Sequence, residues 1–273
     1  MITKKLFKLG ASVCVKAPAG AAFPIVDPDI YRSIDWLYEN DFDTIEVHIP
    51  SPDLVDRVRL KEYLDERGMS ASSVGTGLAV AYEGLIITSK DPDVRARAIR
   101  RLQDQCDLGA YLHCPVIIGS MRGRVSEEQS YAEVDALMFD ACRQIMNYAE
   151  PRGVEVVIEA IDRSETNYLL TADDVLGVID RVGSRYLKVH LDTFHMNIEE
   201  TDWAEPVRRC GTRLGHVHIA DNTRHYPGSG MIDFRPFLAA LKEVGYDGSL
   251  VFEILPGEDG YRSCRLGREH LLR

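Results

Sequence analysis

Short apolar runs rich in β-branched residues alternate with longer stretches of helical periodicity along the whole chain. Apolar runs of four to seven residues predict β-strands, and their alternation with helical stretches is typical of repeated strand–helix units. The predicted strands lie at residues 7–13, 44–48, 70–75, 116–119, 155–159, 187–192, 216–219 and 250–253.

The stretches between these strands carry helix start signals. Asp27-Pro28, Asp53 and Asp91-Pro92 each stand at the head of a helical pattern. Ser126 with Gln129 resembles a capping box before the longest helix, which is expected to end near Gly153. The predicted helices cover residues 27–40, 53–67, 91–108, 126–153, 171–182, 203–211 and 233–245.

Eight strand–helix units in 273 residues favour an α/β fold of the (β/α)₈ TIM-barrel type. An open doubly wound sheet is the structural alternative, because it is built from the same units. No long Gly/Pro/Ser-rich linker or low-complexity tract divides the chain, so we expect one domain over residues 1–273.

The composition, with 45% hydrophobic and 27% charged residues, is that of a globular protein. The net charge of −11 repels phosphate backbones, so we expect no nucleic-acid partner.

Lys8 interrupts the apolar stretch after Lys4 and Lys5, which makes it too short for a signal peptide. No run approaches the roughly 18 apolar residues of a membrane span. The six cysteines form no CxxC pair. We therefore expect reduced thiols, no membrane partner and a cytoplasmic location.

Side chains that can bind a metal follow four strands of the second half. Glu159, Asp192, His218 and Glu253 each stand at the end of an apolar run, with gaps of 33, 26 and 35 residues. Successive barrel strands therefore bring them to one rim, the catalytic face of such a fold. Three carboxylates gathered there would repel one another, and a divalent cation removes that conflict. Oxygen-rich ligation with one imidazole favours Mn²⁺, with Mg²⁺ or Co²⁺ as alternatives.

The motifs around these residues resemble the D-tagatose 3-epimerase/D-psicose 3-epimerase family, within the xylose isomerase-like TIM-barrel superfamily. The resemblance is carried by IEAIDRSE (158–165), LDTFHMNIEE (191–200), GHVH (215–218), NTR (222–224) and YDGSLVFE (246–253). In the first half, VGTG (74–77) and VIIGSMRGR (116–124) are more similar to the subgroup of 5-keto-L-gluconate epimerases.

The resemblance implies an isomerase that epimerises a keto sugar or keto sugar acid. It implies that Glu159, Asp192, His218 and Glu253 hold the metal and that Glu159 and Glu253 are also the catalytic acid and base. It further implies that substrate oxygens are bound by Glu165, His195 and Arg224. Members of the family are commonly dimers or tetramers, so a homo-oligomer is expected.

Elementary chemistry supports the same roles. A proton on the carbon beside a ketone is too weakly acidic for a carboxylate unless the resulting enediolate is stabilised, which a bound cation does. Two glutamates on opposite faces of that carbon then remove one proton and return another, which inverts the centre. Proton transfer on one face to the adjacent carbon gives aldose–ketose isomerisation instead.

The remaining candidates are weighed by their neighbours. His190 shares a strand face with Asp192, and His216 shares one with His218, so both are interpreted as barrel-interior residues. His48 has no partnering motif and is interpreted as structural or solvated. Arg122 and Arg124 follow the fourth strand, where an arginine could bind a substrate carboxylate. They motivate the hypothesis of an acidic sugar substrate.

Several other functions share this scaffold. A 3-epimerase of neutral ketohexoses and an aldose–ketose or hydroxypyruvate-type isomerase remain open, as does an inosose dehydratase-like enzyme. A zinc-dependent AP endonuclease is disfavoured, because Val74-Gly75 and Ile118-Gly119 stand where it needs extra histidines. A sugar-binding barrel without activity is disfavoured by the presence of both candidate acid/base glutamates.

Overall fold

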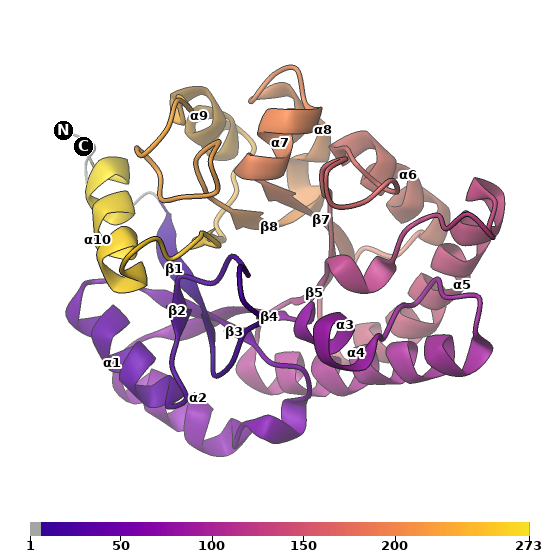
Figure 1. Ribbon diagram of the computed structural model, residues 1–273, viewed down its shortest axis with the longest axis horizontal. Helices are drawn as coiled ribbons and strands as arrows, with labels where there is room; N and C mark the ends of the chain where they lie inside the picture. The colour runs from indigo at the N-terminus through magenta and orange to yellow at the C-terminus, as the bar shows by residue number, and fades with distance from the viewer. Residues whose placement is uncertain (1–6, 273) are drawn as a thin grey trace.

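The computed structural model describes residues 7–272 and is a closed parallel β-barrel surrounded by helices (Figure 1). Pairing of the last strand with the first closes the barrel, with Leu9 opposite Leu250 and Ala11 opposite Phe252. The barrel strands are β1 (Lys8–Cys14), β3 (Thr44–His48), β4 (Ser70–Gly75), β5 (Val116–Ile118), β6 (Val156–Glu159), β7 (Leu187–Asp192), β8 (Leu214–His218) and β9 (Ser249–Phe252). The short β2 (Ile25–Val26) pairs with the end of β1. The predicted TIM barrel is confirmed, and the open sheet is wrong.

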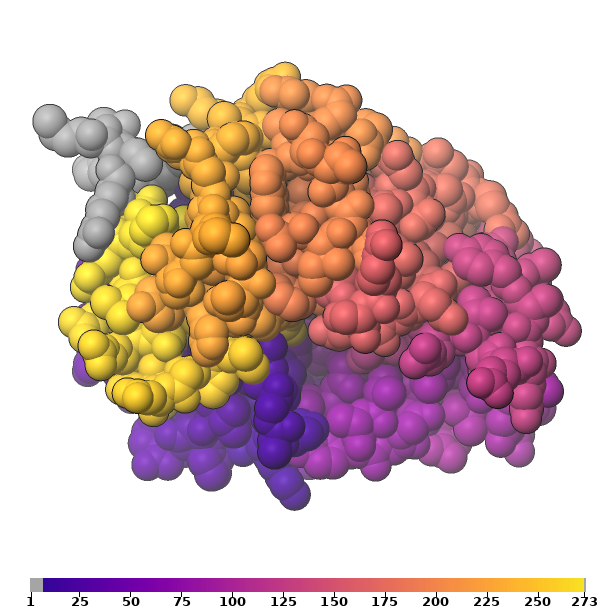
Figure 2. All heavy atoms as spheres, turned by 45° about the horizontal axis from the view of Figure 1, so that its top comes forward, coloured from indigo at the N-terminus to yellow at the C-terminus, as the bar shows by residue number. Residues whose placement is uncertain are grey.

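Helices cover the outside of the barrel in chain order (Figure 1). They are α1 (Ile30–Glu39), α2 (Arg57–Glu66), α4 (Pro92–Leu112), α5 (Tyr131–Ala149), α6 (Ala172–Val182), α8 (Glu205–Cys210), α9 (Arg235–Glu243) and α10 (Gly260–Leu271). Two short helices, α3 (Leu78–Glu83) and α7 (Thr193–Glu199), follow β4 and β7 closely. Single 3₁₀ turns occur at Pro52–Leu54, Ser120–Arg122, Glu150–Arg152 and Gly211–Arg213. In Figure 2 the C-terminal segment packs beside the N-terminal one, as barrel closure requires.

The start of α5 differs from the sequence prediction. The capping box is formed by Ser130 and Glu133, each of which satisfies the other's backbone N–H. The Ser126 hydroxyl instead donates to the Gln129 side chain, which donates in turn to the Thr88 carbonyl. The charged carboxylate of Glu133 is the stronger acceptor for a backbone N–H, so the helix begins at the later serine.

The eighth outer helix, α10, gave no clear signal in the sequence. Its buried positions are mostly small or weakly apolar: Gly260, Ser263, Cys264, Gly267 and Leu271. These positions recur at helical spacing, but small and weakly apolar residues among charged ones do not stand out as apolar positions in the sequence. Gly260 is required there, since a Cβ would lie 1.6 Å from the Pro24 carbonyl oxygen.

The cysteines and the lengths of the helices can be described for residues 7–272. The six cysteines are all buried and unpaired, consistent with reduced thiols. Within residues 7–272, the helices all fall short of the length and apolarity needed to cross a membrane.

Candidate functional site

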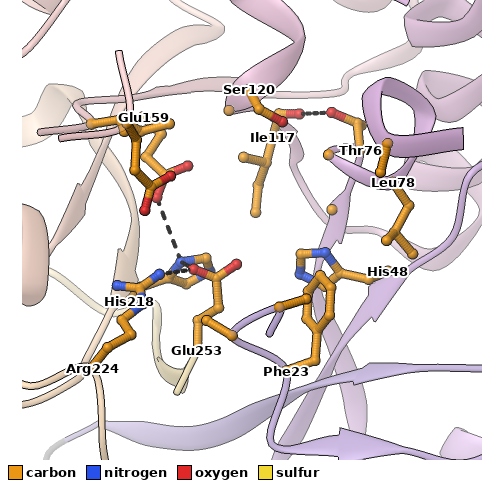
Figure 3. A pocket seen from close by; sticks show the side chains of 18 of the residues that line it. Phe23, His48, Thr76, Leu78, Ile117, Ser120, Glu159, His218, Arg224 and Glu253 are labelled. Carbon is orange, nitrogen blue, oxygen red and sulfur yellow. Dashed lines mark hydrogen bonds and ion pairs between the residues drawn. The ribbon is translucent and has the colours of Figure 1, made fainter. Parts of the chain in front are cut away.

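Four metal-capable side chains meet at the carboxyl end of the barrel. Glu159, Asp192 and His218 are the last residues of β6, β7 and β8, and Glu253 directly follows β9. Register places Asp192 opposite His218 across the β7–β8 pair. One ligand atom from each of the four residues lies within 4.8 Å of the others. The structure thus brings together the whole set predicted from the sequence, of which Figure 3 labels Glu159, His218 and Glu253.

The arrangement fits a divalent cation. Three carboxylates and one imidazole form a hard, oxygen-rich donor set that suits Mn²⁺, Mg²⁺ or Co²⁺. Glu159 Oε1 and His218 Nδ1 are buried and have no hydrogen-bond partner. His218 Nδ1 lies 3.3 Å from Glu253 Oε2, 3.6 Å from Asp192 Oδ2 and 3.8 Å from Glu159 Oε1. Unpaired buried polar atoms are costly, and a shared cation would satisfy both of these.

The three carboxyl groups differ in how easily they ionise. Burial, reinforced by the nearby Glu253, raises the pKa of Glu159 to about 7. For Asp192 the effect of burial is outweighed by Arg224 and His218, so its pKa lies well below the usual range. For Glu253 it is outweighed by the charges of His218 and Arg224, and its pKa is also lowered. Environments that push two carboxyl pKa values apart are typical of an acid/base pair.

A cavity of about 380 Å³ opens beside this cluster, within the size range of small-molecule sites. Glu159 and Glu253 enter it from opposite sides in Figure 3. Glu165, His195 and Arg224, the predicted substrate-binding residues, all line it. Its apolar walls are formed by Phe23, Leu78, Ile117, Ile161, Phe194 and Leu255. A mixed apolar and hydrogen-bonding lining of this kind suits a sugar.

His195 and Arg224 are held by carboxylates. His195 Nδ1 lies 2.6 Å from Asp162 Oδ2, which directs its Nε2 to within 3.7 Å of Glu159. Burial alone would lower the pKa of His195, but the bond to Asp162 outweighs it and the pKa is raised. The Arg224 guanidinium forms ion pairs with both Asp192 and Glu253. Arg224 also adopts a left-handed backbone with φ of 61°, as do Asp41, His113 and Leu169, which do not line the cavity.

Sequence reasoning missed His48, the last residue of β3. It lines the cavity, packs against Phe23 with ring centroids 4.5 Å apart and ring planes tilted by 57°, and contacts Glu46 through Nε2 at 2.5 Å. The earlier interpretation as a structural or solvated histidine is therefore incomplete. The available signal was its position at the carboxyl end of a barrel strand.

The space for His48 depends on Gly75, at the end of the neighbouring strand β4. A Cβ on Gly75 would lie 2.2 Å from His48 Cε1, so we expect Gly75→Ala to destabilise the fold by about 1–3 kcal/mol. Urea unfolding measures the change. Gly177→Ala is the matched control, because nothing lies within 4 Å of its Cβ position and Gly177 is in α6, where alanine is the better helix former. Equal stability of Gly75→Ala and the unsubstituted protein would contradict the expected clash.

The other sequence candidates lie away from the cavity. His190 and His216 are buried in the barrel interior, as predicted. Arg122 is fully buried, donates to the Glu159 carbonyl oxygen, and has its pKa lowered to about 10 by burial. Arg124 is exposed to solvent. Neither arginine lines the cavity, so the hypothesis that they bind a substrate carboxylate loses its support.

Comparison with known proteins places this barrel in a family. The model of the xylose isomerase-like TIM barrel family matches residues 34–266. The chain belongs to this family. One relative is the L-ribulose 3-epimerase of Methylomonas sp. (strain DH-1), which is 34% identical over 80% of this chain and 75% of the relative. Another is the ketose 3-epimerase of Arthrobacter globiformis, which is 34% identical over 82% of this chain and 77% of the relative.

A solved structure gives the same grouping. The crystal structure of D-allulose 3-epimerase from Methylomonas sp. in complex with D-allulose is 26% identical, with a TM-score of 0.81 over 97% of this chain and 96% of that chain. Within the family the chain thus belongs with the carbohydrate epimerases. The family resemblance and the isomerase class inferred from the sequence are confirmed.

Proposed function

We propose that the protein is a divalent-metal-dependent 3-epimerase of neutral ketoses. The observation that carries the proposal is the pair Glu159 and Glu253. Both belong to the four-residue metal-capable cluster, and they enter one cavity from opposite sides (Figure 3). The names of the related ketose and L-ribulose 3-epimerases support both the reaction type and the substrate class.

Proton transfer follows from the placement of the two glutamates on opposite sides of the cavity. When bound, a divalent cation supplies electrostatic stabilisation of the negative charge that develops on the ketose oxygens. Glu253, with its lowered pKa, is ionised and accepts the proton from C3. Glu159, which enters the cavity from the other side, delivers a proton to the opposite face of that carbon. The roles exchange in the reverse direction.

The neighbouring polar groups position the sugar. His195 presents Nε2 to the cavity because Nδ1 is engaged by Asp162. We assign His195, Glu165 and Arg224 to the hydrogen bonds that orient the carbonyl and adjacent hydroxyl groups between the two glutamates. The surrounding apolar side chains exclude water from the reacting carbon.

The charges around the cavity favour a neutral substrate. Among the described lining residues Arg224 alone is a Lys or Arg, and its guanidinium is already paired with Asp192 and Glu253. Glu165 adds a further acidic group to the lining. A substrate carboxylate that lies away from the proposed cation would lose its hydration without meeting an unpaired Lys or Arg among the described lining residues, which is costly.

A substrate panel tests the proposal directly. We expect the Mn²⁺-loaded protein in D₂O to exchange neutral ketoses at C3, with deuterium incorporated there and the carbonyl retained at C2, as followed by NMR. Carbonyl migration between C1 and C2 would instead indicate an aldose–ketose isomerase. Turnover of keto-uronates in preference to ketoses would restore the acidic-substrate hypothesis.

Arg124 offers a separate check of substrate charge. We expect Arg124→Ala to leave KM within about twofold for ketoses and keto-uronates alike, because its exposed side chain does not line the cavity. Steady-state kinetics with both substrate types measures this, with Arg143→Ala on the outer helix α5 as the control. A rise in KM confined to keto-uronates would show that Arg124 reaches an acidic substrate.

A further inference from the structure

A single buried carboxylate lies behind the metal-capable cluster. Glu46, in the middle of β3, is fully buried and points into the barrel interior, where its neighbours come from β3 itself and from three other strands, β1, β4 and β8. Its two oxygens contact Ser12 Oγ (3.1 Å), Ser73 Oγ (2.5 Å), His48 Nε2 (2.5 Å), His216 Nε2 (2.8 Å) and His218 Nε2 (2.9 Å). The carboxylate therefore joins the interior of the barrel to the catalytic end.

The contact with His218 determines which ring nitrogen can act as a ligand. A carboxylate only accepts hydrogen bonds, so the Nε2 of His218 must carry the proton that it donates to Glu46. A metal binds the neutral imidazole, and in that form of the ring the lone pair is on Nδ1. Nδ1 is the atom that faces Asp192 and Glu253 and that has no hydrogen-bond partner.

The ring of His218 is also fixed in orientation. Both Glu46 oxygens lie 2.9 Å from Nε2, and the His190 ring packs edge-on against it at a centroid distance of 4.1 Å and an angle of 86°. Neither ring nitrogen of His190 has a hydrogen-bond partner, so His190 restrains the ring by packing while Glu46 alone bonds to Nε2. The tautomer is set by Glu46.

We propose that Glu46 is a positioning residue for the metal centre, which holds His218 in the Nε2–H tautomer with Nδ1 directed at the cation. The inference rests on the proposed metal-dependent function. Partners of this kind on a ligating histidine typically change metal affinity by about 10–100-fold when removed. The same carboxylate holds His48 in the cavity wall, so its loss should also affect sugar binding.

Two variants separate charge from shape. Glu46→Gln keeps the size of the side chain but introduces an N–H₂ group that requires an acceptor, so at least one facing imidazole must change tautomer or lose its bond. Glu46→Asp keeps the negative charge but shortens the side chain by one methylene group, which moves the carboxylate away from the imidazoles. Ser73→Ala is the matched control, because it removes a hydrogen bond to Glu46 without touching His218.

The first measurement is Mn²⁺ binding by EPR titration of the metal-free protein, with circular dichroism as a check of folding. We expect Mn²⁺ to bind at least about 10-fold more weakly to Glu46→Gln, with Glu46→Asp also weakened and Ser73→Ala close to the unsubstituted protein. The second is the ¹⁵N spectrum of the histidine rings with the diamagnetic cation Mg²⁺ bound, because metal binding requires the neutral form of the His218 ring. It should report the Nε2–H tautomer of His218 in the unsubstituted protein and a mixture in Glu46→Gln.

The possible results distinguish the two proposals. Unchanged Mn²⁺ affinity and an unchanged His218 tautomer in the folded Glu46 variants would overturn the role of Glu46, while epimerase activity of the unsubstituted protein would leave the proposed function standing. An unsubstituted protein that binds no Mn²⁺ and epimerises no ketose would overturn both. If Glu46→Gln does not fold, Glu46→Asp provides the same two readouts.

Discussion

Replacing Glu253 with glutamine is expected to lower the rate of ketose epimerisation by about 10²–10⁴-fold, the usual contribution of a positioned acid or base. The amide keeps the shape of the side chain but accepts no proton from carbon at a useful rate. Glu159→Gln should reduce net epimerisation to a similar extent, because inversion needs a proton-transfer group on each face. Formation of the C3 epimer, followed by NMR or chromatography, measures both losses.

The two variants should differ in their partial reactions. With one glutamate intact, exchange of the C3 proton with D₂O can continue on that face without inversion, so each variant should exchange only one of the two epimers. Glu155→Gln is the control, since Glu155 lies just before β6, at the opposite end of the strand from Glu159. Full epimerisation by Glu253→Gln, or exchange of both epimers by each variant, would contradict the two-glutamate mechanism.

The metal-capable cluster could be predicted because it depends on where each residue lies along its strand, which the sequence shows directly. Each of its residues ends or directly follows a short apolar strand, and parallel barrel strands place their carboxyl ends on one rim regardless of the loops between them. Glu159 and Asp192 are the last residues of β6 and β7, as predicted. Errors of one or two residues at the other strand ends leave the rim unchanged.

Glu46 shows what the sequence did not reveal. In Thr44-Ile45-Glu46-Val47-His48, alternation alone suggests a strand with one apolar and one polar face, the latter turned to solvent. Barrel closure turns that polar face inward, and the cost of burying it is offset by histidines and serines from three other strands. These partners are up to 172 residues away in the chain, so no local pattern identifies them.

Arg122 is the opposite case, because a side chain expected at the cavity lies away from it. Its place just after β5 correctly put it on the catalytic side of the barrel, but the 3₁₀ turn at Ser120–Arg122 directs its side chain beneath the Glu159 backbone. Loop conformation decides whether a charged group lines a cavity or supports it from behind, and composition carries little information about that choice. Substrate selectivity was therefore the least predictable property of the site.

Removal of the metal is expected to abolish epimerase activity and to lower thermal stability together. The buried cluster concentrates three carboxylates, with Glu159 Oε1 and His218 Nδ1 left without hydrogen-bond partners, so a cation that binds the folded protein stabilises it by mass action. At a free Mn²⁺ concentration of 100 times Kd the stabilisation is about 2.7 kcal/mol. For a domain of this size that corresponds to a Tm higher by about 5–10 °C.

Calorimetry before and after chelation, with activity measured on the same samples, tests this linkage. Adding Mn²⁺ back should restore both the epimerase activity and the Tm. Asp192→Asn should lose most of the Tm increase, because it removes a ligand charge that is fully buried. Glu155→Gln, outside the cluster, should keep it. Activity that survives chelation, in protein shown by elemental analysis to be free of metal, would contradict a metal-dependent reaction. A Tm increase that persists in Asp192→Asn would place the stabilising cation elsewhere on the protein.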